Sequence, residues 1–333
     1  SWTDISESYT PDRWYEMMKL AFGHGVNLFD NAETYGDGLA EKNMGFAVKK
    51  GIAEGIWSRE DLVITTKMFF GAKRYDLAGP NDRGLGRKHI IEGTKASLKR
   101  LELDYVDVIF CHQQDEHTPI EETVRAMNFV IEQGWAFYWG TSNWSAAAIT
   151  EACDIADRLG LIRPVVEQPE YNLLERSRVE VEYDGLYKKY KLGLTTWAPL
   201  AFGFLTGKYS SGVPEGSRME NPLYKSFVGD FDIRVAKADK LKPIADELGM
   251  TLAQLALAWC VSNENVSSVL MGAKTTSQLE DNLKVLGMLD SLTPEVKAKM
   301  DKIVPSENKP KQGGYSVRAQ HLLSICRCPN DCE

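Results

Sequence analysis

The sequence lacks both an excess of positive charge and any long apolar run. Its 333 residues include 39 Lys and Arg against 47 Asp and Glu, which gives a net charge of −8. Because nucleic-acid-binding domains need a basic patch or stripe, we predict no nucleic-acid partner. No stretch approaches the roughly 20 apolar residues that a membrane-spanning helix needs, so we do not expect a membrane-embedded protein.

Cysteine is also scarce, with 6 in the whole chain. Cys111, Cys153 and Cys260 stand apart in apolar surroundings, which is typical of buried free thiols. Such thiols indicate a reducing compartment, and we therefore expect a cytoplasmic protein. The other cysteines crowd into the C-terminal tail, where no fourth ligand completes a familiar metal site, so we predict no metal.

No strand is followed by the Gly-x-Gly-x-x-Gly turn that a Rossmann dinucleotide-binding domain requires. Gly84-Leu85-Gly86 lies in a loop before a helix pattern, not after a strand. Instead, short apolar runs alternate with helical patterns, which is typical of βαβ units. Several runs are apolar throughout, as in parallel strands that are covered on both faces. The number of units favours an α/β fold of the (β/α)8 TIM-barrel type.

The expected strands lie near 26–30, 62–67, 105–110, 136–140, 165–168, 193–197 and 267–270. A first helix begins at the capping sequence Thr10-Pro11-Asp12 and runs to about Gly25. Further helical patterns lie near 39–51, 88–101, 119–133, 145–159 and 177–191. Only seven strands can be found, and we expect the first barrel strand to be missing upstream of Ser1.

Two stretches depart from this alternation. A connection from Trp197 to about Arg234 is rich in Gly and Pro, and loops this long in compact domains are usually functional. It follows a strand at the end where barrels keep their active sites. Residues 311–333 show no clear period, so we predict a barrel over residues 1–310 followed by a disordered or atypical tail.

Four polar residues stand at or just beyond the ends of three expected strands. Asp30 ends the first of these strands and Tyr35 follows in the next loop. Lys67 ends the second strand, and His112 comes just after the third. A Lys at the end of a buried strand is costly unless it is paired, which suggests that these residues meet.

Together these residue types can make a general acid. A free Tyr has a pKa near 10, and a nearby ammonium lowers that value by stabilising the phenolate. Lys67 can supply the ammonium and Asp30 can keep it charged, so that Tyr35 donates a proton to a carbonyl oxygen. The alternative is a structural ion pair with a surface Tyr and a loop His, and sequence spacing alone does not exclude it.

Three segments resemble the catalytic segments of the aldo-keto reductase superfamily. Asn27-Leu28-Phe29-Asp30-Asn31-Ala32-Glu33-Thr34-Tyr35 resembles the segment with the catalytic Asp and Tyr. Ile64-Thr65-Thr66-Lys67 resembles the strand with the catalytic Lys. Leu103-Asp104-Tyr105-Val106-Asp107, followed by His112, resembles the strand with the catalytic His.

The likeness runs from Trp2 to about Pro305, and within the family it is greatest to the β subunits of voltage-gated potassium channels. Stretches such as Tyr138-Trp139-Gly140-Thr141-Ser142 carry this closer resemblance. It implies a TIM barrel that binds NADP and reduces carbonyl groups. Animal channel β subunits usually carry Asn where this chain has His112, so the complete catalytic set favours real catalysis here.

The resemblance also implies the role of each site residue. Tyr35 would be the proton donor, tuned by Lys67 and Asp30, while His112 orients the carbonyl. The expected cofactor-binding residues are Trp2, Asp30, Ser142, Asn143, Gln168, Trp197, Pro199, Leu200, Gly203, Lys208, Ser217, Arg218, Gly272, Lys274, Gln278, Asp281 and Asn282. Among them Lys274 and Arg218 favour NADP over NAD, because the 2′-phosphate of NADP needs cations.

Two functions follow from the resemblance. The first is NADPH-dependent reduction of a small apolar aldehyde or ketone, bound near Trp2, Phe69, Phe70, His112 and Trp144. The alternative is a cytosolic β subunit of a voltage-gated potassium channel that senses NADP. Under that alternative we expect a homotetramer that reaches the membrane by binding a channel α subunit.

Overall fold

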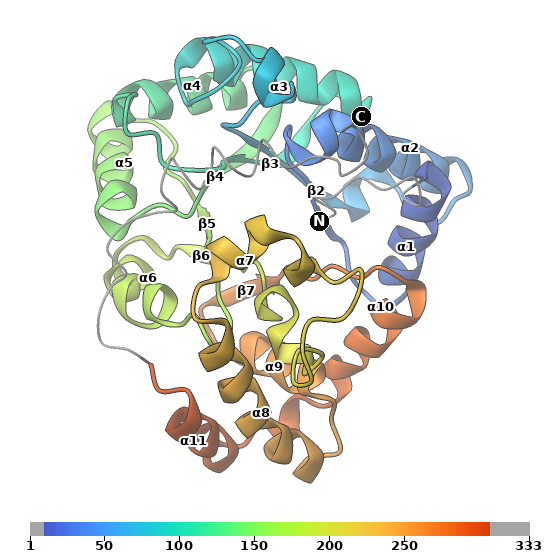
Figure 1. Cartoon of the computed structure of the whole chain (residues 1–333). Helices are drawn as coiled ribbons and strands as arrows, with labels where there is room; N and C mark the ends of the chain where they lie inside the picture. Colours follow the sequence, from blue (N-terminus) through green and yellow to red (C-terminus); the bar gives the residue numbers. More distant parts are fainter. Residues whose placement is uncertain (1–9, 307–333) are drawn as a thin grey trace. The chain divides into compact units, whose positions relative to one another are not determined.

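The computed structural model describes residues 10–306, which divide into two compact units (Figure 1). The first unit holds the described residues up to Pro169, together with Gly185–Thr195 and Leu270–Leu283. The second unit holds Glu170–Asp184, Thr196–Val269 and the described residues from Lys284. Trp2 and residues 311–333 lie outside the described residues, so what the sequence predicts for them stays a prediction.

The strands follow one another in the sheet in sequence order, from β1 to β7. They are β1 (Leu28–Asp30), β2 (Val63–Met68), β3 (Val106–Cys111), β4 (Ala136–Ser142), β5 (Val166–Gln168), β6 (Gly193–Thr196) and β7 (Val266–Val269). Neighbouring strands from β1 to β6 pair in parallel. This arrangement confirms the (β/α)8-barrel fold class, with one strand fewer in the described residues than the eight of a complete barrel.

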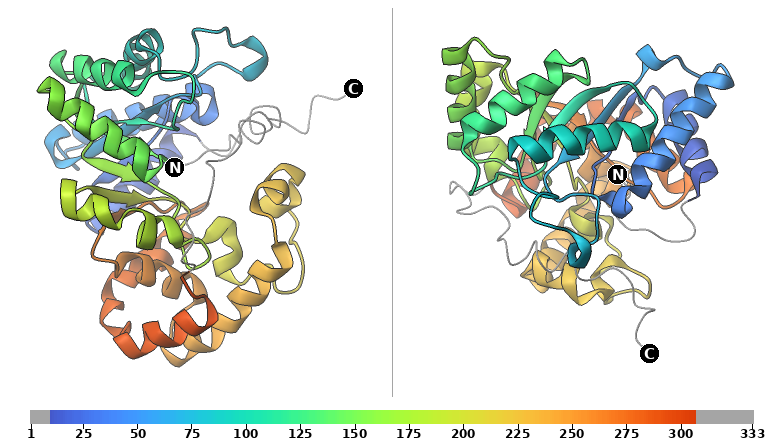
Figure 2. Two further views of the ribbon diagram at one scale, coloured as in Figure 1. Left: turned by 90° about the vertical axis from the view of Figure 1, so that its left-hand side faces the viewer. Right: turned by 90° about the horizontal axis from the view of Figure 1, so that it is seen from above.

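Helices α1 to α5 lie outside the strands of the first unit and follow one another around them (Figures 1 and 2). They are α1 (Pro11–Gly23), α2 (Leu39–Ala53), α3 (Arg87–Leu101), α4 (Ile120–Glu132) and α5 (Ala146–Leu159). The same unit contains most of α6 (Asp184–Tyr190) and all of α10 (Thr276–Leu283). Helices α1 to α5 therefore cover the outer face of these strands.

Local sequence signals explain where these helices begin. At α1 the side-chain oxygen of Thr10 accepts a hydrogen bond from the backbone of Arg13 at 3.3 Å, and Pro11 occupies the first turn. At α5 the hydroxyl of Ser145 accepts from the backbone of Ala148 at 3.2 Å. Both ends satisfy backbone N–H groups that a helix start leaves without a partner inside the helix.

The strand β2 is buried on both of its faces. Ile64 and Thr66 lie on one face of the strand, and Thr65 and Lys67 lie on the other. All four side chains are buried. Since successive side chains of a strand point to opposite faces, one set meets the helix layer and the other points to the inner face. The hydroxyl of Thr66 donates to Glu41 of α2 at 2.5 Å, which assigns Thr66 to the helix side. Lys67 consequently points to the inner face.

The helical pattern expected near 177–191 is confirmed. The backbone forms a π-helical turn, Arg178–Glu182, followed by α6. Tyr183 joins the two with φ −91° and ψ 0°. The sequence pattern predicts the helical stretch but does not indicate that its first turn is π-helical.

In the second unit, the long connection from Trp197 to about Arg234 forms short helical segments. Two 3₁₀ turns, Ala201–Thr206 and Arg218–Glu220, precede α7 (Pro222–Val228) and α8 (Phe231–Glu247). The unit continues with α9 (Leu252–Val261) and ends with α11 (Pro294–Ile303). Within residues 10–306, no single helix is both long and apolar enough to cross a membrane, and α8 with α9 meets that test only as a pair bent by 88°.

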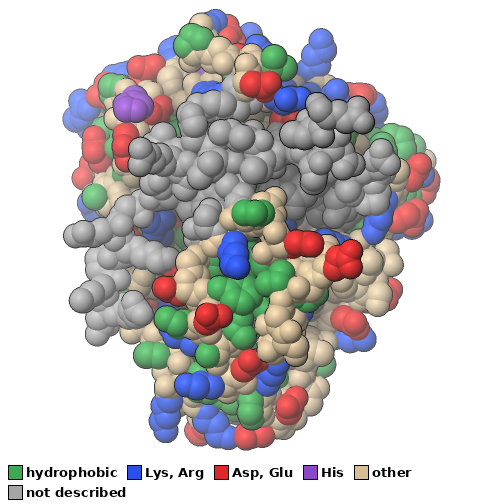
Figure 3. Space-filling view, in the orientation of Figure 1, with side chains coloured by type: hydrophobic (Ala, Val, Ile, Leu, Met, Phe, Trp, Pro, Cys, Tyr) green, Lys and Arg blue, Asp and Glu red, His purple; other side chains and the backbone are tan. Residues whose placement is uncertain are grey.

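Acidic and basic side chains are interspersed over the described part of the face shown in Figure 3. Lys and Arg form no continuous field on this face. Many charged side chains are paired instead, as in the exposed pair Lys88–Glu92 at 2.5 Å on α3. The three cysteines of the described residues, Cys111, Cys153 and Cys260, are buried and free, which confirms the prediction made for them.

Candidate active site

The four residues predicted to act together lie at the carboxyl ends of β1, β2 and β3. Asp30 is the last residue of β1, and Tyr35 opens the short 3₁₀ turn that follows it. Lys67 is the penultimate residue of β2, and His112 comes directly after β3. Because these strands are parallel neighbours, their carboxyl ends meet at one edge of the sheet, and the structure brings the four together there.

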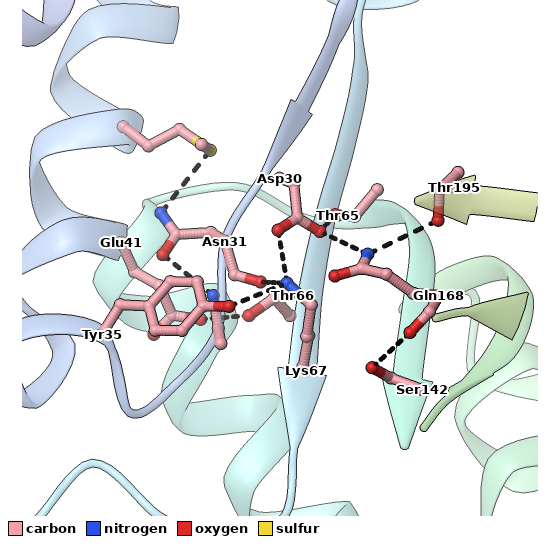
Figure 4. A network of polar contacts seen from close by, with 12 residues as sticks. Asp30, Asn31, Tyr35, Glu41, Thr65, Thr66, Lys67, Ser142, Gln168 and Thr195 are labelled. Atoms are coloured by element: carbon pink, nitrogen blue, oxygen red, sulfur yellow. Dashed lines mark hydrogen bonds and ion pairs between the residues drawn. The ribbon is translucent and has the colours of Figure 1, made fainter. Parts of the chain in front are cut away.

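Lys67 is the centre of the group (Figure 4). Its side chain is completely buried, and its ammonium forms an ion pair with the Asp30 carboxylate. The ammonium also donates to the backbone oxygen of Asn31 at 2.7 Å and lies 3.4 Å from the hydroxyl oxygen of Tyr35. Three acceptors offset the cost of removing this charge from water.

Electrostatics keep the pair of Lys67 and Asp30 ionised. Burial is the largest influence on the Lys67 ammonium and lowers its pKa, but the charges and hydrogen bonds of Asp30 and Tyr35 together outweigh it, so the pKa ends above its ordinary value. Burial is also the largest influence on the Asp30 carboxyl and raises its pKa, but the charge and hydrogen bond of Lys67, together with the Gln168 hydrogen bond, outweigh it, so the pKa ends below its ordinary value. The Tyr35 hydroxyl therefore lies beside a permanent positive charge at neutral pH.

Asp30 is fixed by two further donors. Thr65 of β2 donates its hydroxyl hydrogen to Asp30 Oδ1 at 2.8 Å, and Gln168 of β5 donates from its side-chain amide to the same oxygen at 3.0 Å. One carboxylate oxygen thus receives Thr65 and Gln168, while the other receives Lys67. Both oxygens are engaged, which fixes the direction in which Asp30 holds the ammonium.

His112 is half-buried between two aromatic rings. Its ring stands edge to face with Tyr35 at a centroid distance of 5.7 Å and with Phe70 at 5.0 Å. Its Nδ1 is buried and has no hydrogen-bond partner among residues 10–306. Burial and then the positive charge of Lys67 lower the pKa of His112 from 6.5 to about 3. The imidazole is therefore neutral at pH 7 and can offer one N–H donor without a charge.

The three residues expected to hold an amide group lie beside this set. Ser142, the last residue of β4, donates its hydroxyl hydrogen to the backbone oxygen of Gln168 at 2.8 Å. Asn143 follows with φ 58°, a left-handed conformation that Asn tolerates better than most residues. Its side-chain amide lies 3.3 Å from the Ser142 hydroxyl oxygen. The bond from Gln168 to Asp30 connects this polar trio to the proton-donor set.

The predicted phosphate-binding segment lies at the start of α10 in the same unit. The backbone of Lys274 donates to the side chain of Gln278 at 2.8 Å, and Arg13 of α1 donates to the backbone oxygen of Lys274. Leu279 and Leu283 pack in an apolar cluster with residues of α1. Lys274, Gln278 and the predicted Gly272 and Asp281 are exposed, whereas Asn282 is buried. A cation at an accessible helix start suits an anionic group.

The other predicted cofactor residues belong to the second unit. They share the stretch that begins after β6 and contains Trp197, Pro199, Leu200, Gly203, Lys208, Ser217 and Arg218. Gly203 has φ 99°, and a Cβ atom there would come within 2.6 Å of the Lys208 side chain. Lys208 and Arg218 are exposed, so this stretch offers two accessible cations.

The comparison with known families decides the class of this protein. Residues 1–305 match the model of the aldo/keto reductase family. The chain belongs to the aldo/keto reductase family. This confirms the family predicted from the sequence segments around Asp30, Lys67 and His112, and it makes the protein a member of a family of oxidoreductases that generally bind a nicotinamide cofactor.

Two curated relatives cover nearly the whole of this aldo/keto reductase. A protein of Arabidopsis thaliana is 56% identical over 312 residues, which are 93% of this chain and 92% of the relative. A protein of Oryza sativa subsp. japonica is 54% identical over 288 residues, which are 86% of this chain and 85% of the relative. Both are named "Probable voltage-gated potassium channel subunit beta", and this agrees with the predicted subgroup.

Several residues of this reductase site escape prediction from the sequence. Thr65 contacts Asp30, and the only signal is its position two residues before Lys67, on the same face of β2. The backbone oxygen of Asn31 accepts from Lys67, and a backbone oxygen leaves no trace in a sequence. Glu33 is completely buried near Tyr35, although an acid in a loop is ordinarily exposed.

Proposed function

We propose that this protein reduces aldehydes and ketones to alcohols with NADPH, and that Tyr35 donates the proton to the carbonyl oxygen. The observation that carries the proposal is the position of the Lys67 ammonium between the Asp30 carboxylate and the Tyr35 hydroxyl oxygen, 3.4 Å from the latter. A buried ammonium at this place stabilises the phenolate that remains when Tyr35 gives up its proton.

His112 is suited to orient the substrate. Since its imidazole is neutral at pH 7, it can donate one hydrogen bond to a carbonyl oxygen and does not compete with Tyr35 as an acid. Phe69 and Phe70, both half-buried, form an edge-to-face pair at 4.9 Å, and Phe70 contacts the ring of His112. An apolar substituent of the substrate would meet these rings. Trp2 and Trp144 are also expected near the substrate, and Trp2 lies outside the described residues.

The residues present fit a nicotinamide dinucleotide. When it is bound, the nicotinamide supplies the hydride that the carbonyl carbon accepts. Ser142, Asn143 and Gln168 offer donors and acceptors for a carboxamide, and the Gln168 nitrogen is already committed to Asp30, which leaves its oxygen as the acceptor. Lys274 is proposed to hold the 2′-phosphate, and this favours NADPH over NADH.

Tyr35→Phe tests the proton donor, because it removes the hydroxyl and keeps the ring. NADPH consumption is followed with a panel of aldehydes and ketones. We expect kcat to fall by a factor of about 10²–10⁴, the usual contribution of a general acid. NADPH affinity should remain unchanged. Tyr138→Phe, which removes the hydroxyl of an exposed Tyr on β4, should keep the wild-type turnover. Wild-type turnover in Tyr35→Phe would show that Tyr35 is not the donor.

A second function is favoured by the names of the two relatives, which are both called probable channel β subunits. Under this proposal the protein is cytoplasmic, forms a homotetramer and reaches the membrane by binding the α subunit of a voltage-gated potassium channel. Co-purification with the cytoplasmic tetramerisation domain of such a channel tests it. Absence of binding at micromolar concentrations would contradict this function and leave the reductase proposal intact.

A further inference from the structure

Glu33 is a buried carboxylate that takes no part in the proton transfer proposed above. It lies between Asp30 and Tyr35 in the turn after β1, and only 1% of its surface is exposed. Its Oε1 accepts hydrogen bonds from the backbone of Phe69 at 2.8 Å and of Gly71 at 2.9 Å. His89 Nε2 of α3 lies 3.0 Å from the same oxygen, and since a carboxylate accepts, that nitrogen is the donor.

The backbone around Glu33 extends the pairing of β1 with β2. The N–H of Asn31 donates to the oxygen of Thr65 at 3.0 Å, and the N–H of Glu33 donates to the oxygen of Lys67 at 3.2 Å. The Glu33 side chain continues this pairing beyond the end of β2, because it accepts from the backbone N–H groups of Phe69 and Gly71. One residue therefore joins the turn that carries Tyr35 to the segment Phe69–Gly71.

The segment that Glu33 holds has little freedom of its own. Gly71 has φ 76°, and a Cβ atom there would come within 2.2 Å of the backbone oxygen of Asp82. The backbone oxygen of Phe69 accepts from Gly84 at 2.8 Å, which ties the segment to the far end of the β2–α3 connection. Phe69 is thus anchored at both of its backbone polar groups, since its N–H donates to Glu33 and its oxygen accepts from Gly84.

The anchored segment carries the two rings that stand beside the catalytic group. Phe69 and Phe70 form an aromatic wall, with Phe70 at 5.0 Å from His112 and His112 at 5.7 Å from Tyr35. A shift of the segment would move Phe70 relative to His112. It would leave Lys67 in place, because Asp30 and Asn31 hold its ammonium independently.

We propose that Glu33 is a positioning residue that fixes the aromatic wall of Phe69 and Phe70, and that this wall selects aromatic aldehydes over short aliphatic ones. The inference rests on the proposed reductase function and adds a substrate class to it. The energy of stacking or edge-to-face contact between aromatic rings depends on their geometry. The binding of an aromatic substrate should therefore depend more on the position of Phe70 than the binding of a short aliphatic one.

The test compares benzaldehyde with propanal in steady-state assays. Glu33→Leu removes the oxygen that accepts from Phe69, Gly71 and His89. Glu33→Gln keeps an acceptor oxygen on a side chain of the same length. We expect Glu33→Leu to raise KM for benzaldehyde about tenfold or more, with little change in kcat or in KM for propanal. Glu33→Gln should restore most of the benzaldehyde KM. Exchange of the Phe69 and Gly71 amide hydrogens should be faster in Glu33→Leu than in the wild type.

Glu41→Leu is the matched control, because Glu41 is also a completely buried carboxylate but contacts Thr66 and Arg100 on the helix side of β2. It should destabilise the fold without changing the ratio of the two KM values. Phe70→Ala carries the test if Glu33→Leu does not fold, and it should raise KM for benzaldehyde alone. In the variant that combines Glu33→Leu with Phe70→Ala, the effects on KM should not add, since both act through one ring.

The outcomes separate the two proposals. If the wild type reduces benzaldehyde but Glu33→Leu and Phe70→Ala leave the ratio of KM values unchanged, the inference about Glu33 is wrong and the reductase function stands. If the wild type reduces neither aldehyde nor any other carbonyl compound, the proposed reductase function is wrong. The proposed preference for aromatic aldehydes is then wrong as well.

Discussion

At the scale of single residues, the site depends on one buried ion pair. Lys67 and Asp30 are both removed from water, and each is satisfied by the other and by further hydrogen bonds. Such a pair contributes little net stability compared with an apolar pair of the same size. Breaking it is costly, however, because one charge then stays buried without its partner.

Asp30→Asn should therefore destabilise the protein strongly, by about 3–5 kcal/mol, because it leaves the Lys67 ammonium buried without a counter-charge. Urea unfolding at pH 7 measures the loss. The double variant Asp30→Asn/Lys67→Met removes both charges and should recover a large part of it. Glu92→Gln breaks the exposed pair with Lys88 and should cost no more than about 0.5 kcal/mol. A similar cost for Asp30→Asn would contradict the importance of the buried pair.

His112 should make stability fall in acid. Its folded pKa of about 3 lies below the ordinary 6.5, so the unfolded state binds more protons between these two values. The free energy of unfolding should decrease as pH falls from about 6.5 toward 3, by up to about 1.4 kcal/mol per pH unit from this residue. His112→Asn lacks this contribution, so its stability should depend less on pH over the same range. Urea titrations at several pH values measure the difference, and equal slopes would refute it.

At the scale of elements, the start of α10 is built to present charge. The helix is attached to α1 by the Arg13 contact and by the apolar cluster, while Lys274, which precedes its first residue Thr276, is exposed. The backbone of the segment is fixed by Gln278, so the position of the cation is defined by the helix. An anion bound here would gain from the ammonium and from the helix N-terminus together.

Lys274→Ala should weaken NADPH binding about tenfold and leave NADH binding nearly unchanged, since only NADPH carries the 2′-phosphate. Fluorescence titration of each dinucleotide measures both affinities. Lys99→Ala replaces an exposed Lys of α3 and should change neither. An equal loss for the two dinucleotides in Lys274→Ala would place this lysine on another part of the ligand, or on none.

At the scale of the whole molecule, the sequence predicts the strand order and the meeting of Asp30, Tyr35, Lys67 and His112 well. The reason is that apolar runs mark strands, and parallel neighbours bring polar residues at their carboxyl ends to one edge. The contacts of Thr65 and Glu33 cannot be predicted in this way, because they depend on side-chain direction and on backbone groups of another segment. The π-helical turn Arg178–Glu182 cannot be predicted either, because an apolar pattern indicates a helix without specifying the spacing of its hydrogen bonds.

The hydrogen bond between Gln168 and Asp30 has a consequence for redesign. A substitution of Gln168 that is meant to change the binding of a nicotinamide carboxamide also removes a donor from the carboxylate that holds Lys67. Under the proposed function, carboxamide binding and the acid strength of Tyr35 therefore cannot be changed independently at this residue. A library that varies Gln168 should vary Thr65 with it, because Thr65 is the other donor that can compensate at the same oxygen.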